Sequence, residues 1–404
     1  MDFYRHLFTR SPEGSPVTFT LIYIVSIIFT FQTLLTAYSS STYLEQFIAP
    51  NKVGLLFAVG AFGAIIVSLI LPRILQALGN VKTILILVLL INLTLVLIGS
   101  AITPTLTIAA FILFLIINPQ VYLNIDIFLE TLIGENEGGT GTKRGFILAI
   151  MSVAAFFSPL VMGIIIGDNN NLSGIYYVGA GVGLLLLCVI IARFRHFYDP
   201  VYRIIKVRDM IRDSVSNLDL RTVMATQFLL QFFFAWAVIY IPLFLATEVG
   251  LDWTSISYIL AAGLFAFVLF EYPIGVLADR RFGEKEMMAV GFVILAIASA
   301  SITYMATVGL IGWMLLMFFS RIGASLVEVT TESYFFKQVK GDQPNIISLF
   351  RLMRPLANLA GALVGSITLY YLDKHGAPFG FMFFVLAFVM ASGVFITSYL
   401  TDTK

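Results

Sequence analysis

The chain has 404 residues, of which 59% are hydrophobic and only 12% are charged. An average soluble domain carries roughly 25% charged residues, so this composition excludes a soluble globular enzyme, a disordered chain and a disulfide-stabilised scaffold. The net charge of +1 gives no electrostatic footprint for nucleic acid. The composition is that of a helical protein that crosses the lipid bilayer many times.

Twelve apolar segments are long enough to span a membrane, which takes about 20 residues in a helix. The sequence predicts spanning helices at residues 17–40, 53–72, 82–101, 105–131, 145–167, 174–194, 220–247, 254–278, 286–306, 308–336, 345–371 and 377–400. The longest polar stretch separates the first six from the last six. We therefore expect an all-α membrane protein in three parts: an N-terminal six-helix bundle in residues 1–194, a cytoplasmic linker with an amphipathic helix in residues 195–219, and a C-terminal six-helix bundle in residues 220–404.

The basic residues predict the orientation. If the N-terminus is inside, the inner loops and tails hold nineteen lysines and arginines and the outer loops hold two. Basic residues concentrate on the cytoplasmic side of membrane proteins, so we expect both termini in the cytoplasm. The short loops favour a bacterial inner membrane.

Acidic pairs reveal a weak internal repeat. Asp126 and Glu130 in the fourth segment, and Glu328 and Glu332 in the tenth, are each four residues apart and are related by the same shift of 202 residues. A polar turn and a helix that begins with basic residues follow each pair, with Arg144 in the first half and Arg351 in the second. This pattern predicts two pseudo-symmetric bundles related by an axis along the membrane normal.

A motif follows the eighth segment. Gly275-Val-Leu-Ala-Asp279-Arg280-Arg281-Phe-Gly283 resembles the signature loop of the major facilitator superfamily, G-x-x-x-D-R-x-G-R-[RK]. Together with the twelve spans and the repeat, the resemblance covers nearly the whole chain. It implies the fold of that superfamily and secondary transport of a small solute by alternating access. In the first half the motif is degenerate, and Gly79 is its main remnant.

The motif residues predict a gate at the cytoplasmic side. Gly275 would let two helices approach closely, Asp279 would accept hydrogen bonds from a helix N-terminus near Gly145, and an arginine of the motif would pair with Glu332. The expected gate comprises Gly275, Asp279, Arg280, Arg281, Gly283, Glu332, Arg351, Glu130 and Arg144. The alternative is an ordinary basic inner loop whose arginines are solvated.

Charged residues inside the spans are the main candidates for function. An unpaired charge in the middle of a bilayer costs on the order of 2.5–3.5 kcal/mol, so such a side chain should face a wet cavity or a partner. In one interpretation Arg354 or Arg321 binds an anionic group, and Glu271 or Glu328 gains and loses a proton. In the other, Arg321 with Glu328, and Arg351 with Glu332, are fixed ion pairs.

Polar residues on the helices that line the superfamily's central cavity complete the set. The expected substrate-binding or coupling residues are Glu271, Arg321, Glu328, Arg354, Asp126, Gln227, Gln231, Tyr240, Gln32 and Asn124. For the uncharged ones the alternative is hydrogen bonding between helices.

The sequence and the resemblance thus predict a proton-coupled secondary transporter, with a lean to an anionic or zwitterionic solute. Its expected partners are the solute, protons and the lipid bilayer, and we expect a monomer. We expect no cofactor, metal ion or nucleic acid, and no enzymatic activity, because no metal-ligand spacing and no nucleophile–base pair is found. The alternatives are an uncoupled facilitator, and a protein of this fold that acts as a sensor or assembly partner without transport.

Overall fold

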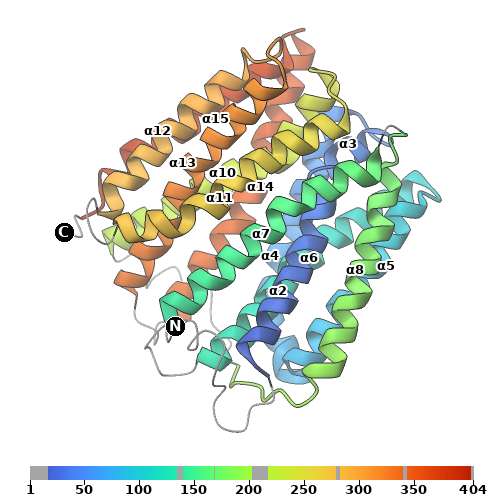
Figure 1. Ribbon diagram of the computed structural model, residues 1–404, viewed down its shortest axis with the longest axis vertical. Coiled ribbons are helices and arrows are strands. Elements are labelled where there is room, and N and C mark those ends of the chain that lie inside the picture. Colours follow the sequence, from blue (N-terminus) through green and yellow to red (C-terminus); the bar gives the residue numbers. More distant parts are fainter. Residues whose placement is uncertain are drawn as a thin grey trace. The chain divides into compact units, whose positions relative to one another are not determined.

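A computed structural model describes residues 17–133, 140–167, 169–202, 217–278, 283–339 and 344–401. Within these ranges the regular structure is entirely helical (Figure 1). Twelve of the helices are long and apolar enough to cross a membrane. The prediction of an all-α protein with twelve spans is therefore confirmed.

The observed helix ends agree with the expected ends to within a few residues. The largest differences are at the second span, which continues to Leu78, at the fifth, which begins at Thr140, and at the last, whose α-helix begins at Met382. The helices are α2 (Phe19–Ala37), α3 (Ser40–Glu45), α4 (Pro50–Leu78), α5 (Asn80–Ser100), α6 (Pro104–Ile133), α7 (Thr140–Ile166), α8 (Leu172–Arg193), α10 (Leu218–Thr247), α11 (Trp253–Leu277), α12 (Glu284–Ile302), α13 (Leu310–Gln338), α14 (Pro344–Lys374), the short 3-10 turn η2 (Phe379–Phe381) and α15 (Met382–Thr397).

The chain divides into two compact units. The first unit comprises Met1–Ala37 and Phe62–Ile204, and the second comprises Tyr38–Ala61 and Ile205–Lys404. The segment Tyr38–Ala61, with α3 and the beginning of α4, therefore packs with the second half of the chain. The amphipathic helix expected in the linker falls on residues 203–216, which lie outside the described residues.

In the first unit, buried polar side chains join three helices. Gln32 of α2 donates hydrogen bonds to the Asn92 side chain of α5 (2.9 Å) and to the Gly179 carbonyl of α8 (3.0 Å). Gly183 makes room for them, since a Cβ there would lie 1.8 Å from the Asn92 amide oxygen. Hydrogen bonds of this kind hold helices together where lipid offers no hydrophobic driving force between them.

In the second unit, α13 packs against both α11 and α12. It crosses α12 at two glycines: a Cβ on Gly323 would lie 2.9 Å from the Gly291 carbonyl oxygen, and a Cβ on Gly291 would lie 2.8 Å from that of Gly323. The two backbones can approach this closely only because both residues lack a side chain. The crossing fixes α13, the helix that carries the charged candidates Arg321, Glu328 and Glu332.

Gly323→Ala is expected to lower the free energy of unfolding by about 1–3 kcal/mol, the usual cost of overpacking a tight contact. Gly181 of α8 offers a matched control, since a Cβ there would meet nothing within 4 Å. Gly181→Ala should therefore leave the unfolding temperature unchanged or slightly higher. Thermal unfolding of both purified variants in detergent measures the difference. Equal unfolding temperatures would show that the glycine crossing is not needed.

Helices α10 and α14 meet through two aromatic side chains. The Trp236 indole donates to the Gly361 carbonyl (2.9 Å) and the Tyr240 hydroxyl to the Ala362 carbonyl (2.8 Å). A Cβ on Gly365 would lie 2.2 Å from the Tyr240 ring. Glycines on α14 thus form the surface that receives the aromatic face of α10.

Candidate functional site

Three glutamates and an arginine of the second unit gather in what we call the acidic cluster: Glu271, Glu328, Glu332 and Arg354. Glu328 of α13 interacts electrostatically with Glu271 of α11, with Glu332 one turn further along α13, and with Arg354 of α14. Glu271, Glu328 and Glu332 are half-buried and Arg354 is exposed. The sequence singled out all four residues but did not place them together.

Glu328 and Arg354 lie deepest in the acidic cluster, while Glu271 and Glu332 are each six residues from the end of their helix. Glu328 precedes the end of α13 by ten residues, and Arg354 follows the start of α14 by ten residues. At 1.5 Å per residue, each lies about 15 Å along its helix. The three carboxylates repel one another when they are ionised, and the guanidinium of Arg354 attracts them.

Arg321 lies two turns from Glu328 on α13 and has different surroundings. It is 3% exposed, and its guanidinium carbon lies 5.0 Å from the centre of the Phe233 ring of α10. One guanidinium nitrogen is 3.4 Å from the Ser320 hydroxyl, and Tyr38 interacts electrostatically with Arg321. Within the part of the chain that the structure describes, no carboxylate forms an ion pair with Arg321. The alternative of a fixed Arg321–Glu328 pair is therefore wrong, because α13 directs the guanidinium to α10 and Tyr38.

Two further residues, Tyr38 and Gly263, lie close to the Arg321 side chain. Tyr38 is 4% exposed and comes from the segment Tyr38–Ala61 of the second unit. On the α11 side, a Cβ on Gly263 would lie 3.2 Å from the Arg321 Cγ. We call Arg321, Tyr38, Phe233 and Ser320 the arginine pocket. The sequence analysis missed Tyr38 in this role, since nothing in the local pattern around it indicates a partner on α13.

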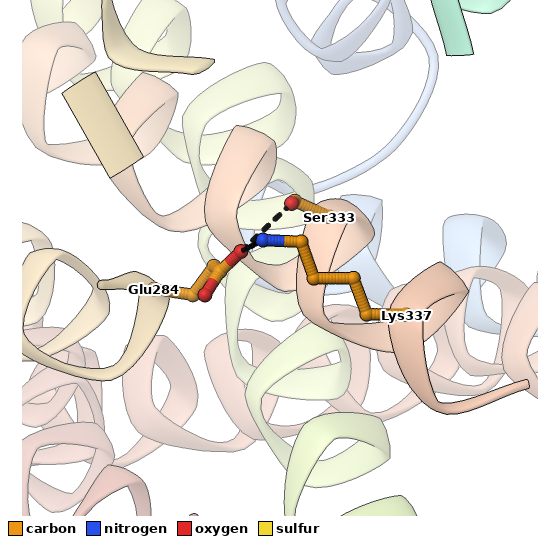
Figure 2. Close-up of polar contacts among 3 residues, drawn as sticks. All are labelled: Glu284, Ser333 and Lys337. Atoms are coloured by element: carbon orange, nitrogen blue, oxygen red, sulfur yellow. Dashed lines mark hydrogen bonds and ion pairs between the residues drawn. The ribbon is translucent and has the colours of Figure 1, made fainter. Parts of the chain in front are cut away.

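Glu284 and Lys337 form an ion pair at the end of α13 (Figure 2). Ser333 also donates a hydrogen bond of 3.0 Å to the same carboxylate oxygen of Glu284. Glu284 begins α12, directly after Gly283 with its left-handed φ of +78°, and is 1% exposed. The superfamily motif often has a basic residue where Glu284 stands, so this pair was not expected.

The gate predicted from the motif is described only in part. Asp279, Arg280 and Arg281, and the side chain of Arg144, lie outside the described residues. Among the described residues, a Cβ on Gly275 would meet only Val329, at 3.7 Å, so the expected close approach of helices is not seen there. The expected helix start near Gly145 is wrong: α7 begins at Thr140, so Gly145 lies within the helix and does not present the free amide groups of an N-terminus.

The first unit contains a counterpart of the motif glycine. Gly79 precedes α5 with φ +77° and ψ +166°, close to the φ +78° and ψ +157° of Gly283 before α12. The Asp199 carboxylate, which follows α8, accepts hydrogen bonds from the Asn80 backbone amide (2.7 Å) and from the Tyr202 hydroxyl (2.5 Å). An acidic side chain at a helix N-terminus, expected for Asp279, is thus observed here for Asp199.

Several uncharged candidates serve packing inside their own units. Gln32 and Tyr240 make the hydrogen bonds described above, and Asn124 of α6 donates to the Gln120 carbonyl (2.7 Å). Gln227 and Gln231 are buried on α10, and Gln227 Oε1 accepts no hydrogen bond from the described residues. The half-buried residues Asp126 and Glu130 belong to the first unit. Hydrogen bonding between helices, the alternative interpretation, therefore fits Gln32 and Tyr240, whereas the Asn124 side chain bonds within its own helix.

Glu45, at the end of α3, gives a pH dependence that can be tested. Burial raises the pKa of its carboxyl to about 7 from an ordinary value of 4.5, and its Oε1 atom accepts no hydrogen bond from the described residues. Between pH 4.5 and 7 the folded protein holds a proton that the unfolded chain releases, so stability falls as pH rises through this window. After allowance for solvent screening of this half-buried group, the loss is about 1–2 kcal/mol.

Glu45→Gln is accordingly expected to raise the unfolding temperature at pH 8 relative to the unsubstituted protein, and to change it little at pH 4.5 and below. Thermal unfolding in detergent at both pH values measures this. Glu248→Gln, which removes an exposed carboxylate just after α10, serves as the control. A stabilisation by Glu45→Gln of equal size at both pH values would contradict the assignment.

A groove of about 430 Å³ lies in the first unit, between α2, α7 and α8. Its lining is apolar throughout, with residues such as Phe31, Val153, Phe157 and Leu185. It offers no polar group to orient a solute. The acidic cluster and the arginine pocket therefore remain the candidate sites for chemistry.

Part of the chain matches a known protein family in sequence, and the fold is similar to that of solved structures. The family model of the Major Facilitator Superfamily matches residues 223–404, which include the acidic cluster, Phe233, Ser320 and Arg321. The fold is similar to that of a mutant of the nucleoside transporter NupG, with a TM-score of 0.72 at 13% identity over 95% of this chain and 100% of that one. It is also similar to a POT family transporter in complex with a thioalcohol-conjugated peptide, with a TM-score of 0.73 at 12% identity over 94% of each chain. A search of curated protein sequences finds no match.

Proposed function

We propose that the chain is a transporter of the Major Facilitator Superfamily, whose family model matches residues 223–404 and whose fold it shares with two known transporters. In this proposal it moves a small solute across the membrane by alternating access, with protons as the coupling ion. The protein is an integral membrane protein with twelve spans. The observation that carries the coupling proposal is the acidic cluster, which sets three carboxylates against one guanidinium inside the spans.

Charge balance explains how such a cluster would couple protons to transport. The charge of the acidic cluster depends on how many of its three carboxylates carry a proton. Crossing the low-dielectric part of the membrane with an uncompensated charge is costly. A proton on Glu328 or Glu271 reduces the negative charge of the acidic cluster. In the proposed mechanism, the conformations open to the two sides of the membrane differ in their affinity for this proton. The proton gradient then biases the direction of movement.

The proton affinity of the acidic cluster would depend on how its three helices are packed. Glu271, Glu328 and Arg354 come from three different helices. A small shift of α11 or α14 relative to α13 changes the distances between their charges. Proton affinity and helix position are then coupled, and the coupling works in both directions.

Proteoliposomes that contain a pH-sensitive dye test the proposal. A panel of amino acids, organic acids, sugars and nucleosides is added outside, and proton movement inside is followed. We expect one chemical class to evoke proton movement that stops when an ionophore collapses the pH gradient. Exchange of a radiolabelled solute without any proton movement would indicate an uncoupled facilitator. Neither exchange nor proton movement for any solute would contradict transport and favour a sensor or assembly role.

A further inference from the structure

Arg321 is a buried cation whose described contacts contain no carboxylate. Its guanidinium lies against the Phe233 ring and near the hydroxyls of Ser320 and Tyr38. These are a π face and two neutral polar groups, and none of them cancels a positive charge. A guanidinium carries five N–H donors in a planar fork, which is more than two hydroxyls can satisfy. The arginine pocket therefore has both a charge and donors to offer to a ligand.

An anion bound at Arg321 would compensate the positive charge of its buried guanidinium. Buried charges in proteins are normally paired, and an ionisable residue within a spanning helix points to a functional site. The position fits, because Arg321 lies eleven residues from the start of the 29-residue helix α13, about 17 Å along it. It is therefore close to the middle of the span, where a transporter of this architecture holds its substrate.

We propose that Arg321 is the anion subsite of the transported solute, and that the solute carries a single carboxylate group. This inference rests on the proposed transport function and names its substrate class. In this proposal the carboxylate accepts hydrogen bonds from the guanidinium fork, beside the Tyr38 hydroxyl. One uncompensated positive charge matches one negative charge, which favours a monocarboxylate or an amino acid over a phosphate ester with two charges.

The distance between the two sites favours coupling. Arg321 and Glu328 are seven residues apart on α13, which places them on nearly the same face, about 10 Å apart along the axis. A carboxylate at Arg321 and a proton at the acidic cluster would then be bound by one rigid helix. Movement of α13 would present both to the same side of the membrane, as solute–proton cotransport requires.

Pairs of small molecules that differ only in charge provide the probes. Lactate and lactamide, benzoate and benzamide, and alanine and alaninamide are each added to the purified protein in detergent, and the unfolding temperature is measured. We expect at least one carboxylate to raise it and its amide to have no effect. In Arg321→Gln the response to that carboxylate should be lost, and in Arg321→Lys the apparent Kd should rise about tenfold, because the charge remains but the fork is lost.

Arg193→Gln is the matched control, since it removes an exposed arginine at the end of α8. It should bind the carboxylate like the unsubstituted protein. A monodisperse elution profile for Arg321→Gln shows that the variant is folded. An amide that binds as well as its acid, no binding of any carboxylate, or an unchanged response in Arg321→Gln would overturn the proposal.

The proteoliposome assay distinguishes a failure of the proposed anion subsite from a failure of the proposed transport function. Proton movement evoked only by solutes without a carboxylate would leave transport intact and would overturn the substrate class. Proton movement evoked by a carboxylate and retained in Arg321→Gln would overturn the role of Arg321 alone. If no solute is exchanged or evokes proton movement, the transport function itself fails.

Discussion

Glu328→Gln is expected to lower proton-driven accumulation of the solute by roughly tenfold or more, within the range set by a coupling free energy of 1–3 kcal/mol. Glutamine keeps the size and the hydrogen-bonding ability of the side chain but does not exchange a proton. The acidic cluster then loses one of its two proposed proton-binding residues, so the pH gradient biases the conformational change much less. Exchange of labelled solute for unlabelled solute across the membrane should persist, because exchange needs no net proton movement.

Proteoliposomes with and without a pH gradient measure both quantities. Glu286→Gln is the control, since it removes an exposed carboxylate in the first turn of α12 and should leave accumulation unchanged. Glu271→Gln should reduce accumulation as well, since Glu271 interacts with Glu328. Full proton-driven accumulation in both Glu328→Gln and Glu271→Gln would show that the acidic cluster is not the coupling site.

The spanning helices could be predicted from sequence because the bilayer imposes a simple length and polarity rule on each of them. The rule does not locate a break between two consecutive helices, and the prediction fails there. The first expected span continues to residue 40, whereas α2 ends at Ala37 and the separate helix α3 begins at Ser40. Hydropathy does not detect such a break, because the residues on both sides of it are suitable for a buried position.

The charged candidates were easier to recognise than their partners. An arginine or glutamate within an apolar run is conspicuous, so Arg321 and Glu328 stood out. Whether they pair depends on tertiary packing, and Tyr38 reaches Arg321 only because the segment Tyr38–Ala61 packs with the second unit. Uncharged residues were harder still: the hydroxyl of Tyr240 could have faced a cavity, and the structure shows it bonded to a carbonyl of α14.

Lys337→Met is expected to destabilise the protein by about 2–4 kcal/mol, since it removes the ion-pair partner of the buried Glu284 carboxylate. The two partners are unequal, because Glu284 is 1% exposed whereas the Lys337 side chain is 46% exposed. Glu284→Gln should therefore cost less, about 1 kcal/mol, since the remaining lysine can be solvated by water. The double variant should be more stable than Lys337→Met alone.

This order of stabilities has a consequence for function. The pair joins the first residue of α12 to the last turn of α13 (Figure 2), and α13 carries both Arg321 and Glu328. Thermal unfolding of the variants in detergent measures the order, with the exposed Lys374→Met as a control that should change little. If Glu284→Gln proves as costly as Lys337→Met, the burial of the glutamate does not set the energy of the pair. If the expected order is found, the pair anchors α13 against α12, so both proposed sites move with one helix.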